Sequence, residues 1–180
     1  WTLKGRELQI TASIGIALYP NDGRDPDALT QSADTAMYRA KEYGDNYQFY
    51  THLMNIKAME RMDLEVSLRR ALEQDEFEVF YQPLVDSRSR QMIGVEGLLR
   101  WHHPRRGLVM PKDFISITEE TGSIISIGEW VLRTACKQHV AWQKAAYAPA
   151  RVAVNISACQ FRQKNFVDMV ARVLMETNMN

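Results

Sequence analysis

Glu96 and Arg100 are the residues whose types and spacing first suggest chemistry. They stand four positions apart in an otherwise apolar stretch, residues 92–103. Burying a charged side chain without a partner costs free energy. Strand alternation would place both side chains on one face, about 13 Å apart at ~3.3 Å per residue, too far apart to pair with each other. Each charge therefore needs a partner of its own.

Two kinds of partner can compensate these charges, and the sequence of residues 92–103 is compatible with either. Other core side chains are the structural alternative. A ligand is the functional alternative, because a carboxylate oxygen suits a hard divalent cation such as Mg²⁺ or Mn²⁺. The planar fork of a guanidinium suits a phosphate. Glu96 is then a candidate metal ligand and Arg100 a candidate anion-binding residue.

Asn155 and Gln82 are further candidates because each stands near the end of a predicted strand. Asn155 closes the apolar segment VAVN, and functional side chains of α/β barrels lie at the C-terminal ends of strands. Its amide oxygen can bind a hard cation, but an Asn here can equally end the strand or cap the next turn. Gln82 shares a strand face with Glu78 and Phe80. It can contact a ligand or simply be a polar residue at a strand end.

The histidines and cysteines give weaker signals. His102 and His103 precede Pro104 in a turn-like segment, and no soft third ligand has metal-site spacing, so we expect them in an exposed loop. Cys136 falls on the packed face of a predicted helix and is expected in the core. Cys159 has no neighbouring base that would activate it. The sequence contains no glycine-rich phosphate loop and no nucleophile elbow.

The composition is that of an ordinary soluble globular protein. Of 180 residues, 46% are hydrophobic and 24% charged, and 22 basic residues balance 22 acidic ones. This balance argues against nucleic acid as a partner and against a membrane-surface patch. No apolar run approaches the ~20 residues of a membrane span. Two cysteines fit a reducing compartment, so we expect a cytoplasmic location. Since the chain lacks an initiator Met, we expect it to come from a longer protein, whose upstream segments can carry any membrane tether.

The N-terminal part of the chain predicts strand, helix and strand. Residues 7–19 alternate between apolar and polar side chains, which is typical of a half-buried strand. Asp25 is a predicted N-cap, and Pro26 suits the first helical position. The helix is expected to end just before Gly44. Residues 47–50 then resume an extended run.

The rest of the chain predicts an α/β arrangement. Residues 54–76 read as one long helix and a stiff connector, with a domain junction near residues 51–60. A hairpin, two helices, a strand and a final helix follow, at residues 77–86 with 91–103, 111–121, 124–145, 151–157 and 166–174. The strand is continuously apolar, which is typical of burial on both faces. This order suits a parallel α/β sheet or barrel.

These segments, in this order, closely resemble two bacterial signalling families. YQPLVD, GVEGLLRWHHPRRGLVMPKDFI, IGEWVLRTACKQ and VAVNISACQF resemble the start of EAL-type cyclic di-GMP phosphodiesterase domains. TASIGIALYPNDGRDP and the residues up to 50 resemble the end of a GGDEF diguanylate cyclase domain. The resemblance implies an α/β fold: the end of a ferredoxin-like GGDEF domain over residues 1–52, a connector helix starting at 53–62, and the N-terminal part of an EAL domain over 63–180. That part is the first half of a (β/α)₈-like barrel with an antiparallel first strand.

The EAL resemblance also implies a reaction. Two divalent metals, Mg²⁺ or Mn²⁺, activate water against one phosphodiester of cyclic di-GMP and give the linear dinucleotide. Glu96 is implied as the signature glutamate and a metal ligand, and Asn155 as another ligand. Arg100 would contact a substrate phosphate, with Gln82 and Leu99 near the bound dinucleotide. The family's catalytic lysine and further acidic ligands have no counterpart in these residues, so we expect the isolated chain to be inactive.

The sequence departs from both family patterns. The signature reads Glu96-Gly97-Leu98, with Gly where Ala is usual, at a position that points away from the face of Glu96. In the GGDEF part, Lys41 is a candidate nucleotide-phosphate contact, but Asp45 replaces a cation of the family pattern. Lys41 can equally be an exposed lysine at the end of a helix, where the helix dipole favours it.

The leading hypothesis is therefore cyclic di-GMP hydrolysis by a GGDEF–EAL signalling protein. One alternative is a receptor that binds cyclic di-GMP without cleaving it. Another is an interaction scaffold in which both domains are degenerate. Homodimerisation through the Met- and Leu-rich connector is compatible with all three.

Overall fold

The computed structural model describes residues 2–3, 6–7, 12–42, 44, 47–146 and 151–179. The chain divides into two compact units, Trp1–Asp63 and Leu64–Asn180, here named the N-terminal and C-terminal units. No helix among the described residues is both long enough and apolar enough to cross a membrane.

The N-terminal unit is built around helix α1 (Pro26–Glu42), which packs on strands β3 (Ile14–Ile16) and β4 (Tyr47–Phe49). β3 and β4 pair in parallel, which confirms the predicted order of strand, helix and strand. Two short antiparallel strands precede them, β1 (Thr2–Leu3) and β2 (Arg6–Glu7). The strand predicted over residues 7–19 is shorter than expected, and its residues 8–11 lie outside the described part of the chain.

Helix α1 begins and ends as predicted. The Asp25 carboxylate accepts a hydrogen bond of 2.8 Å from the Ala28 amide, as an N-cap side chain does, and Pro26 is the first helical residue. Gly44 has φ +69°, and its amide donates to the Lys41 carbonyl at 3.3 Å. This left-handed conformation suits glycine and ends the helix.

Helix α2 (His52–Ala71) runs from the N-terminal unit into the C-terminal unit. It confirms the predicted connector helix, although the expected helical residues after Ala71 form turns instead. The Glu76 amide reaches back to the Ala71 carbonyl at 3.0 Å, and Asp75 has φ +53°. In the C-terminal unit, Leu64 and Leu68 of α2 are buried.

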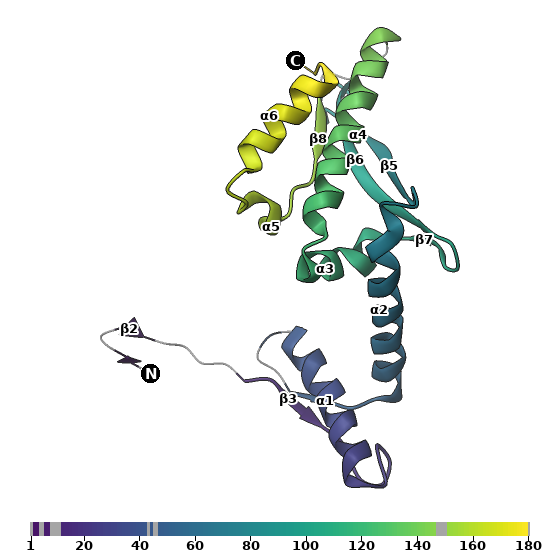
Figure 1. Ribbon diagram of the computed structural model, residues 1–180, viewed down its shortest axis with the longest axis vertical. Coiled ribbons are helices and arrows are strands. Elements are labelled where there is room, and N and C mark those ends of the chain that lie inside the picture. Colours follow the sequence, from purple (N-terminus) through teal and green to yellow (C-terminus); the bar gives the residue numbers. More distant parts are fainter. Residues whose placement is uncertain are drawn as a thin grey trace. The chain divides into compact units, whose positions relative to one another are not determined.

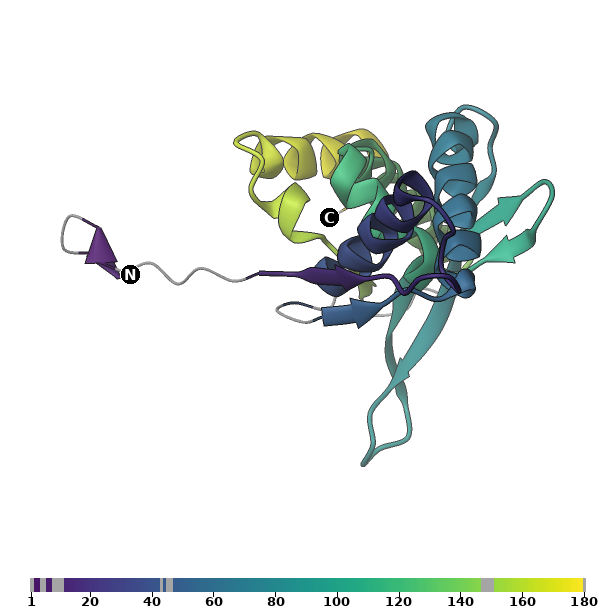
Figure 2. The ribbon, with the colours of Figure 1, turned by 90° about the horizontal axis from the view of Figure 1, so that it is seen from below.

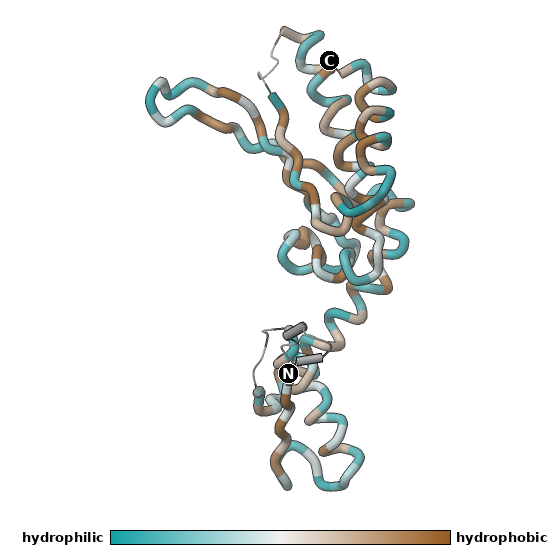
Figure 3. Tube along the Cα trace, turned by 90° about the vertical axis from the view of Figure 1, so that its left-hand side faces the viewer, coloured by the Kyte–Doolittle hydropathy of each residue, from teal (hydrophilic) through white to brown (hydrophobic). Residues whose placement is uncertain are grey.

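The C-terminal unit is built on a four-stranded sheet in which β6 (Met92–His103) is central. β5 (Phe77–Val85) lies antiparallel along one edge of β6. β7 (Gly107–Val109) and β8 (Val152–Val154) share the other edge, β7 antiparallel and β8 parallel. The antiparallel first strand and the later parallel strand confirm the predicted barrel-like arrangement. The β5–β6 hairpin projects beyond the helices (Figure 2), and its tip is hydrophilic (Figure 3).

Helices pack on the sheet of this unit and on each other (Figure 1). α3 (Pro111–Thr121) and α4 (Ile124–Lys144) contact β6, and α4 also contacts β5 and β8. α6 (Phe166–Thr177) packs on α4, and a short helix, α5 (Ala158–Phe161), precedes it. Along β5 the buried residues alternate with exposed ones, so only one face of this strand is covered by the helices.

The core lies between the covered face of the sheet and the helices. Trp101 and Phe114 are fully buried, with ring centroids 5.6 Å apart. The Trp101 indole nitrogen donates to the Glu76 carboxylate at 2.8 Å, which satisfies a polar atom that would be costly to bury alone. Cys136 is 2% exposed, which confirms its predicted place in the core. Phe77 and aliphatic residues complete the cluster of Trp101 and Phe114. The aliphatic members are Leu64, Leu68, Ala71, Val79, Val109, Ile117, Ile127 and Val131.

Two predictions about this unit are wrong. His103 is 2% exposed rather than in an exposed loop, because β7 was not foreseen and folds back beside Trp101–His103. Its Nδ1 accepts from the amides of Arg105 and Arg106 at 3.1 and 3.3 Å, and its Nε2 lies 3.1 Å from the Ser67 hydroxyl. β8 is not buried on both faces, since Ala153 is exposed, on the same side as the exposed residues of β5.

Candidate functional site

The uncovered face of the sheet carries most of the predicted site residues. In the register of the hairpin, Gln82 lies opposite Glu96, and Glu78 lies opposite Arg100. Side chains of directly opposed residues point to the same face. On the other edge of β6, Ala153 of β8 lies beside Glu96. Gln82, Glu96 and Arg100 therefore share one face. Alternation predicts this for Glu96 and Arg100, and the register of the hairpin adds Gln82.

Asn155 and Glu96 are in direct contact. Asn155 comes directly after β8, and its Nδ2 donates a hydrogen bond of 2.7 Å to Glu96 Oε1. The two residues are 59 positions apart in the chain, and the parallel pairing of β6 with β8 brings them together. Glu96 is half-buried and Asn155 is exposed, so the pair is open to solvent. The bond uses one carboxylate oxygen and leaves the Asn155 amide oxygen unengaged by it.

Arg100 is held against the sheet by two contacts. Its Cζ lies 5.4 Å from the centroid of the Phe80 ring, a cation–π distance. Its Nη1 donates to the Leu99 carbonyl at 2.8 Å. Arg100 and Glu96 thus have separate partners, as their spacing predicts, and both are half-buried rather than fully enclosed.

Leu99 is separated from the other predicted site residues. It lies opposite Val79 in the hairpin and packs against the core cluster. Strand alternation therefore turns it to the helix-covered face, away from Glu96 and Arg100. The structure brings Gln82, Glu96, Arg100 and Asn155 to one face and places Leu99 on the other.

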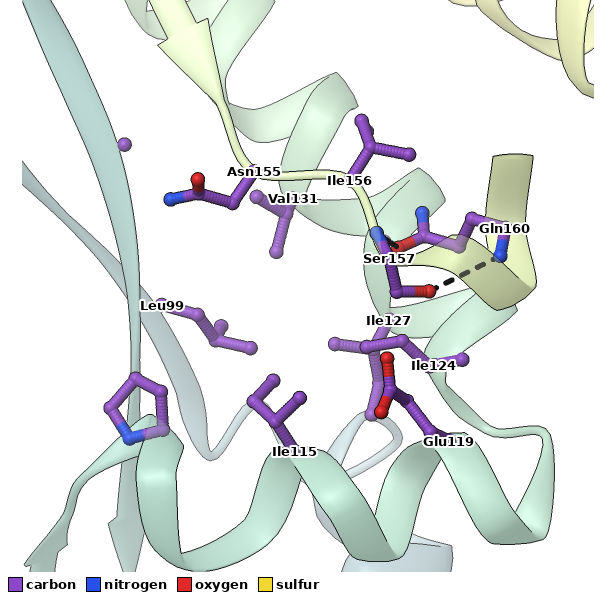
Figure 4. Close-up of a pocket in the computed structure, with 13 residues that line it drawn as sticks. Leu99, Ile115, Glu119, Ile124, Ile127, Val131, Asn155, Ile156, Ser157 and Gln160 are labelled. Atoms are coloured by element: carbon purple, nitrogen blue, oxygen red, sulfur yellow. Dashed lines mark hydrogen bonds between the residues drawn. The ribbon is translucent and has the colours of Figure 1, made fainter.

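A cavity of about 350 Å³ lies on the helix-covered side, beside Leu99 (Figure 4). Its walls are mostly aliphatic, with Ile115 of α3 and Ile127 and Val131 of α4. Glu119, Ser157 and Gln160 add polar groups. The cavity lies on the opposite side of β6 from Glu96, and Asn155 contributes to its lining.

Ser157 and Gln160 form a capping box that orders the segment after Asn155. The Gln160 amide donates to Ser157 Oγ at 3.2 Å, and the Ser157 amide donates to Gln160 Oε1 at 3.1 Å. Gln160 is 2% exposed and lies over Gly128, where a Cβ would be 1.9 Å from Gln160 Nε2. These residues were missed, although the spacing Ser-x-x-Gln in SACQ is the sequence signal of such a box.

Glu78 and His102 were also missed as members of the open face. The His102 Nε2 lies 2.6 Å from Glu78 Oε2. His102 was expected in an exposed loop because it precedes Pro104, although the strand predicted over residues 91–103 contains it and β6 ends at His103. The register of the hairpin would have revealed the contact, since it places Glu78 two positions from His102 across the strands.

Lys41 of the N-terminal unit is exposed in the last turn of α1. Asp45, which bears on the same hypothesis, lies outside the described residues. Among the described residues of both units, no three His, Cys, Asp or Glu side chains are grouped as a metal site.

Comparisons with known proteins find a matching domain family in each of the two parts of the chain. Residues 65–179 match the EAL domain family, and residues 1–47 match the diguanylate cyclase GGDEF domain family. The bifunctional diguanylate cyclase/cyclic di-GMP phosphodiesterase MucR of Pseudomonas aeruginosa is 46% identical over 176 residues, which is 97% of this chain and 26% of MucR. The cyclic di-GMP phosphodiesterase PdeR of Escherichia coli is 40% identical over 173 residues, 96% of this chain and 26% of PdeR. The chain thus spans about a quarter of the length of these relatives.

Solved structures show the same relationship. The structure of the PaMucR phosphodiesterase in complex with c-di-GMP superposes with a TM-score of 0.62 and 44% identity, over 64% of this chain and 47% of that one. The EAL enzyme Bd1971 in its cAMP-bound form gives a TM-score of 0.62 and 27% identity, over 87% of this chain and 40% of that one. The sheet order, the Glu96 signature and these matches lead to one conclusion: the chain belongs to the EAL domain family, preceded by a segment that matches GGDEF domains.

Proposed function

We propose that the protein carrying this chain hydrolyses cyclic di-GMP to the linear dinucleotide. The observation that carries the proposal is the contact between Glu96 and Asn155 on the open face of the sheet. It joins an oxygen-bearing side chain of β6 to one that directly follows β8, with Gln82 opposite Glu96 and Arg100 on the same face. The names of MucR and PdeR, both cyclic di-GMP phosphodiesterases, support the choice of substrate.

We propose Glu96 and Asn155 as ligands of a divalent cation, Mg²⁺ or Mn²⁺. A carboxylate and an amide oxygen form the all-oxygen donor set that such hard cations prefer. The 2.7 Å bond from Asn155 Nδ2 to Glu96 Oε1 supports the proposal because it places the two side chains together, and a rotation of the Asn155 amide would turn its oxygen toward a shared cation. When bound, divalent cations of this type activate water and stabilise the leaving oxygen of a phosphodiester.

The other site residues would bind and orient the substrate. Arg100 presents its guanidinium to a phosphate oxygen, for which its planar fork is suited. Gln82, opposite Glu96, would donate to the bound dinucleotide. Leu99 was predicted to lie near the bound dinucleotide, but its side chain is on the helix-covered face. A contact with the dinucleotide would have to be made on that face of β6. Lys41 stays a weaker candidate phosphate contact in the GGDEF part.

A two-metal centre takes more oxygen ligands than Glu96 and Asn155 supply. We therefore expect other residues of the full-length protein to complete it, and little turnover by these 180 residues alone. We further propose that residues 1–52 belong to a GGDEF domain, 53–62 to the start of the connector, and 63–180 to the EAL domain, with dimerisation through the connector.

The test uses the full-length protein that carries this chain, purified with Mg²⁺ or Mn²⁺. We expect production of the linear dinucleotide, and its loss in Glu96→Gln, which keeps the shape of the side chain but removes its charge. Glu73→Gln, an exposed residue after α2, is the matched control and should keep full activity. Unchanged turnover in Glu96→Gln would exclude our assignment of the metal ligand. Tight binding without turnover would instead select the receptor, and neither binding nor turnover the scaffold.

A further inference from the structure

We propose that His102 and Phe80 are positioning residues that keep the Arg100 guanidinium available for a phosphate oxygen of cyclic di-GMP. His102 binds the Glu78 carboxylate and so keeps it from pairing with Arg100. Phe80 holds the guanidinium in place by a cation–π contact. The inference rests on the proposed function and concerns how the site is prepared for its substrate.

Two basic side chains, those of Arg100 and His102, lie within reach of the Glu78 carboxylate. Its partner across the hairpin is Arg100, and directly opposed residues have Cβ atoms about 5 Å apart, within reach of an ion pair. Its carboxylate Oε2 nevertheless lies 2.6 Å from His102 Nε2. A carboxylate oxygen accepts, so Nε2 carries the proton. His102 therefore engages the acid that would otherwise neutralise Arg100.

The guanidinium of Arg100 is supported where it lies. The Phe80 ring, with its centroid 5.4 Å from Cζ, covers one side of the group. The Leu99 carbonyl accepts from Nη1 at 2.8 Å. Among the described strands this carbonyl lies in a gap on the edge of β6, between residues 95–97, which pair with β8, and residues 101–103, which pair with β7. A guanidinium has five N–H donors, so donors remain for a phosphate.

A phosphate and the Glu78 carboxylate are competing anions for Arg100. Without His102, the Glu78 carboxylate loses its present partner. It can then pair with Arg100, which lies two positions before residue 102 on β6 and directly opposite Glu78. The substrate would then have to displace a carboxylate before it binds. The His102 and Glu78 side chains are 51% and 57% exposed, so solvent screens the interaction and the effect is modest.

The test measures cyclic di-GMP binding and steady-state turnover in the full-length protein. His102→Ala should raise the Kd and the KM by up to about fivefold, the upper end of the range for an exposed ion pair, with kcat unchanged. His102→Arg, which still donates to Glu78, should stay near the wild type. The double variant His102→Ala with Glu78→Gln should regain wild-type affinity, because the competing carboxylate is gone. Phe80→Leu should weaken binding, and Phe80→Tyr should retain it.

His52→Ala, an exposed histidine at the start of α2, is the control, and thermal unfolding checks that each variant is folded. If His102→Ala binds like the wild type, or if the double variant binds as weakly as His102→Ala, the inference is wrong while the proposed function stands. If the wild type neither binds nor cleaves cyclic di-GMP, the proposed function fails and the inference fails with it.

Discussion

Asn155 donates a 2.7 Å hydrogen bond to the carboxylate of Glu96 across two parallel strands. The contact joins the two residues for which the sequence suggests metal binding. Because Asn155 touches the Glu96 carboxylate, replacing its amide with a carboxylate adds a negative charge directly beside Glu96.

Replacing Asn155 with Asp tests this charge. The variant loses the donated bond and sets a second carboxylate against Glu96, so we expect the free energy of unfolding in EDTA to fall by about 1 kcal/mol through like-charge repulsion. With Mg²⁺ or Mn²⁺ the second carboxylate adds a charged ligand. The metal-induced rise in Tm should therefore be larger in Asn155→Asp than in the wild type. Gln74→Glu, an exposed change of the same charge, is the control. An equal or smaller rise in Asn155→Asp would contradict a cation site here.

Gly128 gives a second prediction, on how the segment after Asn155 is held. A Cβ at this position would be 1.9 Å from Gln160 Nε2, so Gly128→Ala must displace the Gln160 side chain and break the capping box with Ser157. We expect a loss of about 1–2 kcal/mol in the free energy of unfolding, the range for losing a helix cap.

The matched experiment places Gly128→Ala in a Gln160→Ala background. The clash is then absent, and the further loss should be close to zero, as for a pair of directly coupled sites. Denaturant unfolding of the four proteins gives the coupling. Additive losses would show that Gly128 and Gln160 do not act together.

Tyr81 gives a third prediction, on pH. Burial, followed by the charge of the nearby Cys136, raises the pKa of Tyr81 to about 12. An unfolded tyrosine has a pKa of about 10, so the unfolded chain loses this proton first as the pH rises. The contribution of Tyr81 to stability is therefore fully present below pH ~10 and is lost as the pH rises toward 12. The absorbance of tyrosinate, recorded for the wild type minus Tyr81→Phe, measures the shifted titration.

The same variant tests the packing around the hydroxyl. Among the described residues the Tyr81 hydroxyl is buried without a hydrogen-bond partner, so its desolvation is uncompensated. Tyr81→Phe should leave the free energy of unfolding at neutral pH within about 0.5 kcal/mol of the wild type, or raise it. A loss of 2 kcal/mol or more would reveal a bond that the structure does not contain.

Gly15 gives a fourth prediction, for the N-terminal unit. A Cβ at Gly15 would be 1.9 Å from the Ala33 carbonyl oxygen and 2.3 Å from the Met37 amide nitrogen. Both are backbone atoms of α1, so Gly15→Ala must push the whole helix off β3. We expect loss of amide protection throughout α1 in hydrogen exchange. Gly44→Ala, with open space but φ +69°, should cost about 1 kcal/mol and keep α1 protected, and loss of protection there as well would refute the packing argument.

The sequence predicts the elements that local chemistry determines. Asp25 and Pro26 start α1, and Pro111 and Gly122 bound α3, because caps and backbone preferences act within one turn. The face shared by Glu96 and Arg100 follows from alternation alone. These features need no knowledge of distant parts of the chain.

Other features depend on contacts that alternation and capping do not encode. The burial of His103 follows from β7, whose residues Gly107–Val109 give too short a pattern to recognise. The exposure of Ala153 depends on which face of β8 the helices cover. The bond from Asn155 to Glu96 depends on the register of two strands that are far apart in sequence. The sequence offers Glu96 and Asn155 separately as candidate ligands, but their direct contact is visible only in the fold.

The separation of 59 positions in sequence between Glu96 and Asn155 also bears on how the molecule assembles. The β5–β6 hairpin joins neighbouring segments, whereas the β6–β8 pairing must close a long loop before it gains any contact, and such pairings form late. We therefore expect the strand with Glu96 to form its hairpin before it pairs with the segment that carries Asn155. Glu96 and Asn155 meet only when the parallel pairing is complete, so on our proposal a partly folded chain has no assembled site with which to capture a cation.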